Sequence, residues 1–155
     1  MERGGELYEP GLMTQFLTAL DILTGLINWG CRFSNDQGKQ MLTYFDQMLR
    51  RGRCVTLSAS GEFIGFCTFF LLTSEAFVNE YIHRSPWSTP HDDPDGTLLY
   101  VDYLAALQWH KALRIEVERR LAERCPSVER AVYCRVESPD RLVRLPRRYP
   151  DVAAV

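Results

Sequence analysis

The sequence lacks the features that would direct it to a membrane or mark a common catalytic motif. Its longest apolar runs fall well short of the roughly 18–20 residues that a transmembrane helix needs. The first ten residues, MERGGELYEP, contain no apolar signal-peptide core, so we expect a cytoplasmic protein. The sequence also has no glycine-rich phosphate loop, no serine-centred nucleophile elbow and no zinc-ligand spacing.

Cysteine is sparse, and no two cysteines form a C-x-x-C pair. Four of the five lie among apolar residues, which favours reduced core thiols over disulfides or a metal site. His91 stands beside Asp92, Asp93 and Asp95, but this run lacks the glycine and the distal glutamate of a calcium loop. We therefore predict a solvated acidic loop and no metal.

Length and charge limit the remaining classes of protein. A chain of 155 residues suits a single domain over 1–155, and we expect a weakly structured tail at 146–155. Residues 1–110 carry 7 basic and 13 acidic residues, whereas residues 111–155 carry 11 basic and 7 acidic ones. The basic third suits a phosphate-bearing cofactor, an acidic partner or a solvated helix face. Nucleic acid is disfavoured because the pI is only 5.9 and aromatic residues rarely alternate with basic ones.

Hydrophobic spacing predicts two helices at the start of the chain. The first runs from Pro10 to Trp29. The second follows a capping box formed by Ser34 and Gln37 and ends near Gly52. The expected inner faces are Leu12, Phe16, Leu20, Leu23 and Ile27 in the first helix, and Met41, Phe45, Met48 and Leu49 in the second.

The rest of the chain alternates strands and helices. Residues 54–72 read as a hairpin in which Ser60 and Gly61 supply the positive φ of the turn, and Phe63–Leu72 is apolar enough to be a central strand. The further expected elements, in chain order, are a short helix at Ser74–Arg84, an irregular loop, a strand at Leu98–Ala105, a helix at Lys111–Arg124, a strand at Arg130–Val136, and one or two helical turns between Ser138 and Pro146.

Three segments in this order carry a family resemblance: GEFIGFCTFFLL, then LLYVDYLAAL, then ALRIEVERRLAERCPSVERAVYCRV. Over Cys54–Leu145 the chain resembles the GNAT acyltransferase superfamily, and within it most closely the RTX toxin-activating lysine acyltransferases. The resemblance implies an α/β (α+β) fold, with a mixed, mostly antiparallel sheet flanked by helices. It also implies transfer of an acyl group from an acyl-CoA or acyl carrier protein thioester to an amine.

Asp102 is the main candidate catalytic residue, and the resemblance matches it to the family's catalytic aspartate. Strand alternation puts Asp102 on one face with Tyr100, a second candidate catalytic residue, and puts Tyr103 on the other face. A buried carboxylate needs a partner or a wet cleft. Asp102 is therefore either a general base or substrate-positioning acid, or a structural residue bonded to an amide, an arginine or a tyrosine hydroxyl. Tyr133 is a candidate proton donor in the same cleft, or a core residue.

The corner after this strand reads LQWHKALR. The resemblance implies that Gln108, Trp109, His110 and Lys111 hold the phosphates of the donor. Lys111 and Leu113, however, occupy positions where the superfamily has glycines that admit the phosphates to the backbone. The family also pairs its aspartate with a histidine near the first helix, and residues 1–82 contain none.

These two departures favour an alternative function. The chain could be a non-catalytic protein on the same scaffold: an adaptor, an inhibitor or a structural subunit, encoded by a phage or a mobile element. The aromatic residues of the Tyr81–His91 loop would then bind a protein partner, and a homo-oligomer is a further arrangement that we keep open.

Overall fold

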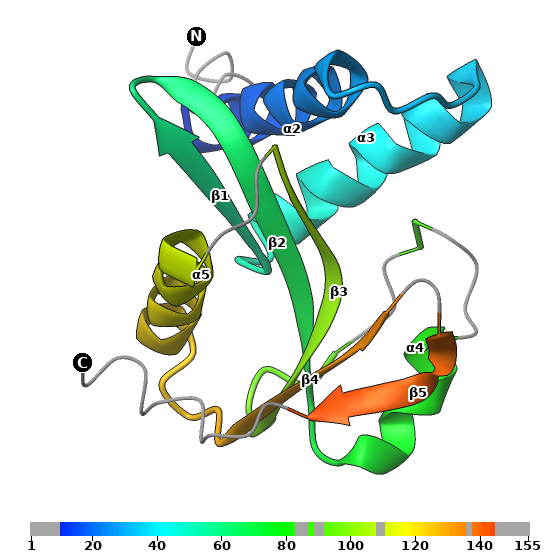
Figure 1. Cartoon of the computed structure of the whole chain (residues 1–155), viewed down its shortest axis with the longest axis vertical. Helices are drawn as coiled ribbons and strands as arrows, with labels where there is room; N and C mark the ends of the chain where they lie inside the picture. Colours follow the sequence, from blue (N-terminus) through cyan, green and yellow to red (C-terminus); the bar gives the residue numbers. More distant parts are fainter. Residues whose placement is uncertain (1–9, 83–86, 89–91, 108–110, 136–137, 145–155) are drawn as a thin grey trace, which may run out of the picture.

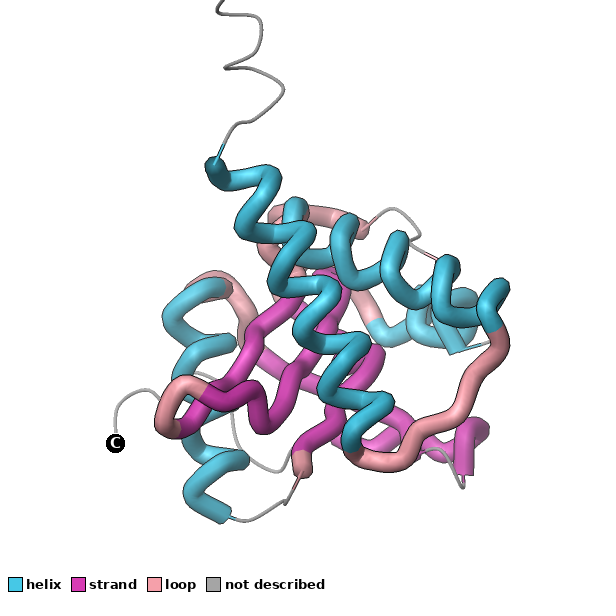
Figure 2. Tube along the Cα trace, turned by 90° about the horizontal axis from the view of Figure 1, so that it is seen from above, coloured by secondary structure: helices cyan, strands magenta, loops and turns pink. Residues whose placement is uncertain are grey.

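The structure is a computed structural model that describes residues 10–82, 87–88, 92–107, 111–135 and 138–144. Helices cover both faces of one mixed sheet (Figures 1 and 2). On one face lie α2 (Pro10–Asn28), α3 (Asn35–Arg50) and α4 (Val78–Ile82), the last preceded by the 3-10 turn η1 (Glu75–Phe77). The opposite face is covered by α5 (Lys111–Arg124). The expected α+β class, with helices flanking a sheet, is confirmed.

Within the described residues, the sheet has five strands in the order β1-β2-β3-β4-β5. The β3–β4 pair is parallel, and the β1–β2, β2–β3 and β4–β5 pairs are antiparallel. A mixed, mostly antiparallel sheet was expected and is confirmed. The strands are β1 (Cys54–Ala59), β2 (Glu62–Leu72), β3 (Leu98–Ala106), β4 (Arg130–Arg135) and β5 (Ser138–Arg144).

The last strand, β5, contradicts the helical turns predicted between Ser138 and Pro146. It pairs antiparallel with β4, for example through Tyr133 with Val143. Pro139 fits the first turn of a helix, but a proline is also tolerated in an edge strand. A single helical turn gains little by itself because its nucleation is costly, whereas β4 offers backbone groups that need partners.

The predicted capping box, hairpin turn and helix end are confirmed. The Ser34 side chain accepts a hydrogen bond from the Gln37 backbone N–H (3.1 Å), and the Gln37 side chain accepts one from the Ser34 N–H (2.9 Å). In the β1–β2 turn, φ is 52° at Ser60 and 80° at Gly61. Gly52, with φ of 72°, follows the last turn of α3. These features depend on neighbours in sequence, so the sequence alone predicts them.

The face of α2 that was predicted to be buried is buried only in part: Leu20 and Leu23 are half-buried, and the side chain of Leu12 lies outside the described residues. Ala19, Ile22 and Leu26 lie in the core, whereas Phe16 and Ile27 are 39% and 49% exposed. The prediction failed because α2 is apolar around most of its circumference, so helical spacing fits more than one face. Even so, none of the helices in the described part of the chain is long and apolar enough to cross a bilayer.

A close contact with the sheet accounts for the face that α2 buries. A Cβ atom at Gly25 would lie only 2.5 Å from the Phe63 ring of β2. Phe63 in turn stacks on Trp29, with ring centroids 5.5 Å apart. Glycine therefore admits an aromatic side chain against the α2 backbone, and this contact turns Ile22 and Leu26 toward the sheet.

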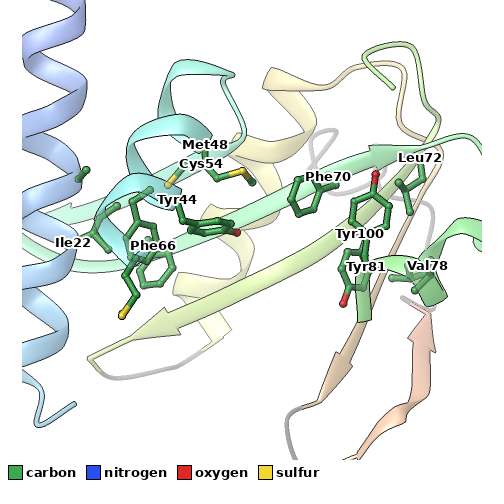
Figure 3. Close-up of a cluster of buried hydrophobic side chains, with 14 of the residues drawn as sticks. Ile22, Tyr44, Met48, Cys54, Phe66, Phe70, Leu72, Val78, Tyr81 and Tyr100 are labelled. Atoms are coloured by element: carbon green, nitrogen blue, oxygen red, sulfur yellow. The ribbon is translucent and has the colours of Figure 1, made fainter. Parts of the chain in front are cut away.

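The sheet separates two apolar cores. The larger lies under α2, α3 and α4 and contains Ile22, Met48, Phe66, Phe70 and Tyr100 (Figure 3). The smaller lies under α5 and includes the predicted inner-face residues Val117 and Leu121. On α3 the predicted residues Met41, Phe45 and Met48 are buried and Leu49 is half-buried, while Tyr44 is a fully buried residue that the prediction omitted.

Candidate functional site

Asp102 occupies a β-bulge in β3. The pairing with β2 passes from Thr68–Tyr103 to Phe69–Val101, so Asp102 is the extra residue on its strand. The pairing of β3 with β4 runs from Leu98 to Val101 and thus ends at the same point. A bulge re-aims side chains and interrupts a ladder. The Asp102 carboxylate therefore lies where β3 bends and the sheet splays, at the point where β3 and β4 cease to pair.

The bulge also changes which residues share a face with Asp102. Tyr103 and Ala105 pack against the core under α2 and α3, together with Tyr100, whereas Val101 and Ala106 pack under α5. The prediction that Tyr103 lies opposite Tyr100 is therefore wrong. Strict alternation cannot anticipate an inserted residue, because each bulge reverses the faces of all residues that follow it.

Asp102 binds a buried tyrosine from α3. The Tyr44 hydroxyl is 2.5 Å from Asp102 Oδ2 and 2.8 Å from Thr68 Oγ1. Thr68 Oγ1 also accepts a hydrogen bond from the Tyr103 backbone N–H (3.1 Å). Tyr44 and Thr68 are both fully buried, whereas Asp102 is half-buried. Figure 3 shows Tyr44 lying between α3 and the strands.

Aromatic rings enclose this network. Trp87 stacks on Tyr103, with centroids 4.2 Å apart, and lies edge-on to Tyr44 at 5.4 Å. Tyr44 also meets Phe45 and Tyr103 edge-on, at 5.3 and 5.5 Å. Trp87 has φ of 60°, a left-handed conformation that costs energy in a residue other than glycine. Packing of Trp87 against Tyr103 and Tyr44 offsets this cost.

An open cleft of about 350 Å³ adjoins the aromatic cluster. It lies between the α2–α3 connection and the end of β3. Its apolar walls include Met41, Phe66, Trp87 and Tyr103, and Arg32 stands among its few polar lining residues. Tyr103, next in sequence to Asp102, is one of these walls. Clefts of this size, apolar with a few polar groups, are typical of small-molecule sites.

The predicted catalytic tyrosines do not join Asp102 in this arrangement. Tyr100 is only 5% exposed and packs on Tyr81, with centroids 6.1 Å apart. Tyr133 pairs with Val101, whose side chain faces α5, so the register puts Tyr133 on the other side of the sheet. The sequence pattern gave no means of distinguishing these tyrosines from Tyr44, which the fold brings to the carboxylate.

The structure describes only part of the corner that was predicted to bind the phosphates of the acyl donor. Gln108, Trp109 and His110 lie outside the described residues, and Lys111 is the first residue of α5, with a side chain that is also outside them. The helix that follows begins at this point and runs to Arg124. The N-terminal end of such a helix presents backbone N–H groups that favour an anion.

The loop aromatics expected to contact a partner point inward where they are described. Tyr81 is 6% exposed and packs on Phe70 at a centroid distance of 4.9 Å. Trp87 is half-buried against Tyr103. His83 and His91 lie outside the described residues. The structure therefore corrects the prediction that Tyr81 and Trp87 form an exposed aromatic surface, because both rings complete the core under α3 and α4.

Asp92, which was predicted to lie in a solvated acidic loop, is largely buried. Asp92 Oδ2 lies 2.7 Å from Arg53 Nε and accepts a hydrogen bond from the Leu71 N–H (3.0 Å). The two side chains of this ion pair are only 14% and 9% exposed. Asp92 therefore fastens the loop to β2 instead of facing solvent. Within the described residues, no group of three or more potential metal ligands comes together.

The buried cysteines have the environment of inert thiols. Cys54, Cys67 and Cys125 are buried, and Cys31 is exposed between α2 and α3. Burial raises the pKa of Cys54 to about 12, with the nearby Arg124 acting weakly in the opposite direction. Burial also raises the pKa of Cys67, and the negative charge of Asp102 adds to that rise. A thiol with a raised pKa is a poor nucleophile near neutral pH.

Sequence reasoning singled out Asp102 but missed Tyr44 and Thr68, and it assigned Trp87 to a partner-binding loop. Thr68 had a usable signal, since it is the one polar residue in the run FCTFFLL. Tyr44 lies three residues after Met41 on the inner face of α3, but its pairing with β3 spans 58 residues of sequence. Comparison with known proteins adds no further assignment: no family model, curated protein or solved structure matches this chain.

Proposed function

We propose that the chain has a GNAT-like arrangement and transfers an acyl group from a thioester donor, acyl-CoA or an acyl carrier protein, to an amine. The order of elements supports the arrangement: two helices, an antiparallel hairpin, a third strand, a crossover helix and a parallel fourth strand. The observation that carries the activity is the Asp102 carboxylate at the splay of the sheet, one residue from the wall of an open cleft.

The chemistry needs a group that accepts a proton from the acceptor. An alkylammonium must lose a proton before its nitrogen attacks the thioester carbonyl; the N–C bond then forms, the C–S bond breaks and the thiolate leaves with a proton. A carboxylate is a much weaker base than an amine, with ordinary pKa values of about 3.9 and about 10.4. The ammonium therefore loses its first proton to solvent, and Asp102 orients the neutral amine, accepts the proton that the nitrogen releases as the N–C bond forms and passes it to the leaving thiolate.

The donor's phosphates are assigned to the corner before α5. The basic side chain of Lys111 and the backbone N–H groups of the first turn of α5 suit a pyrophosphate or a phosphopantetheine phosphate. Gln108, Trp109 and His110 stay a prediction from the resemblance. The cleft at Met41, Phe66 and Trp87 would receive the apolar part of a substrate.

The test is a mass-spectrometric transfer assay with acetyl-CoA and a long-chain acyl carrier protein as donors and lysine peptides as acceptors. Asp102→Asn should lower kcat by about 10²-fold or more, the usual contribution of a proton acceptor, because asparagine keeps the shape and loses the basic oxygen. Asp21→Asn, at an exposed acid on α2, is the matched control and should leave kcat unchanged. Calorimetric titrations that show no donor binding, with folded protein and no product, would refute the proposal.

A second candidate, a non-catalytic protein-binding role, is favoured by the exposed apolar face of α2. Phe16 and Leu17 are 39% and 52% exposed toward one end of that helix. Toward the other end, an open hollow of about 570 Å³ is lined by Leu23, Ile27 and Leu42, among others. A two-fold pairing of antiparallel α2 helices would place the projecting side chains of one copy against the hollow of the other. Sedimentation velocity tests this pairing, and a monomer at every concentration would contradict it.

A further inference from the structure

We propose that Tyr44 is a positioning residue for Asp102: its phenol holds the carboxylate in one orientation and favours its ionised form. The inference rests on the proposed function, in which Asp102 handles the proton of the acceptor. It concerns a residue on α3 that lies 58 positions away in sequence, and it assigns a task to a buried hydroxyl that would otherwise be only a core contact.

When Asp102 is ionised, the donors and acceptors of the network fix the direction of each hydrogen bond. The Tyr103 backbone N–H can only donate, so it gives its proton to Thr68 Oγ1 (3.1 Å). An ionised carboxylate can only accept, so the single Tyr44 proton goes to Asp102 Oδ2 (2.5 Å). The Thr68 hydroxyl proton then points to the Tyr44 oxygen (2.8 Å). The chain runs from the β3 backbone through Thr68 and Tyr44 to the carboxylate.

Packing keeps the phenol in this position. Tyr44 is fully buried, and its ring is met edge-on by Phe45, Trp87 and Tyr103 at centroid distances between 5.3 and 5.5 Å. Its backbone belongs to α3, whose start is fixed by the Ser34 capping box. A side chain held on a helix by close packing positions its hydroxyl more precisely than a loop residue can.

A hydrogen bond from a phenol to the charged form of a carboxyl favours that form. Among the described residues, the titratable groups that face Asp102 are Tyr44 from α3, Cys67 from β2 and the adjacent Tyr103 from β3. The Tyr44 hydroxyl lies 2.5 Å from the carboxylate oxygen Oδ2. Removing its hydroxyl should therefore make Asp102 easier to protonate.

The experiment follows the Asp102 carboxyl carbon by NMR during a pH titration of the ¹³C-labelled full chain. Tyr44→Phe should move the titration midpoint of Asp102 upward by about one pH unit, the size expected for loss of a hydrogen bond to a charged group. Tyr81→Phe is the matched control: it removes a hydroxyl from a second buried tyrosine of the same core and should leave the midpoint unchanged. An unchanged midpoint in folded Tyr44→Phe would overturn the proposal.

A second variant covers the case in which Tyr44→Phe does not fold. Replacing Tyr44 by 3,5-difluorotyrosine keeps the hydroxyl and makes it a stronger donor, so the Asp102 midpoint should move downward; no movement would also overturn the proposal.

An activity assay distinguishes this inference from the proposed function. If wild-type protein transfers acyl groups, the acid limb of the kcat profile should follow the same shifts. If it transfers none while the NMR midpoints move as expected, the activity is wrong and the positioning stands.

Discussion

For the substitution Thr68→Val, the sequence and the structure predict changes of opposite sign in the free energy of unfolding. Thr68 is a fully buried residue within the apolar strand β2. Valine has nearly the same shape as threonine, so Thr68→Val leaves no cavity. Judged from the apolar run alone, the substitution should stabilise the protein, because valine is more apolar and at least as favourable in strands.

The hydrogen bonds reverse that expectation. Thr68→Val leaves the Tyr103 N–H without its acceptor and removes a donor from the Tyr44 oxygen. An unsatisfied buried donor costs about 1–3 kcal/mol. Replacing the hydroxyl by a methyl group gains about 0.8 kcal/mol from added apolar burial. We therefore expect Thr68→Val to lower the free energy of unfolding by about 0.2–2 kcal/mol.

Urea denaturation followed by tryptophan fluorescence and circular dichroism measures this difference. Thr56→Val on β1 is the matched control, since within the described residues its half-buried hydroxyl makes no hydrogen bond. The control should change the free energy of unfolding by no more than about 0.5 kcal/mol. A Thr68→Val protein as stable as wild type, or more stable, would show that the network contributes nothing and would refute the reasoning.

Two further predictions concern packing and pH. Gly25→Ala gains about 1 kcal/mol of helix propensity, but its Cβ would lie 2.5 Å from Phe63, and such overpacking costs about 1–3 kcal/mol. In urea denaturation it should therefore be less stable than Gly38→Ala, whose Cβ meets the Phe33 ring at 3.2 Å; equal stabilities would contradict the contact. Because burial raises the pKa of Cys54 from 9.0 to about 12, the folded state keeps a proton that the unfolded chain loses above pH 9. The free energy of unfolding should then fall with rising pH by about 1.4 kcal/mol per unit for this thiol, and Cys54→Ala should flatten that slope; identical slopes would exclude the effect.

The sequence anticipated elements whose signals are local. The capping box at Ser34, the turn at Ser60–Gly61 and the end of α3 near Gly52 each depend on residues within a few positions of one another. The strand at Ser138–Arg144 was missed for the converse reason. Its conformation depends on pairing with β4, and no residue within the segment indicates that β4 needs a partner strand.

The candidate site was likewise predicted only in part: the sequence identified the acid but not its partner. A carboxylate within an apolar strand is visible in the sequence, and Asp102 was singled out on that ground. Its partner could not be identified, because Tyr44, Tyr100 and Tyr133 are all tyrosines in apolar segments. Only the register of β3 against β2, the bulge and the packing of α3 decide which of them reaches the carboxylate.

By itself, then, the sequence determined the order and type of most elements and one unusual acid, since periodicity, caps and turns are encoded between near neighbours. The tertiary structure decided which face of α2 is buried, where the strand ladder breaks and which hydroxyl meets Asp102. These choices depend on contacts between residues far apart in the chain. The contact of the Phe63 ring with Gly25 and the extra residue Asp102 in β3 determine these choices. Neither feature produces a periodic pattern in the sequence.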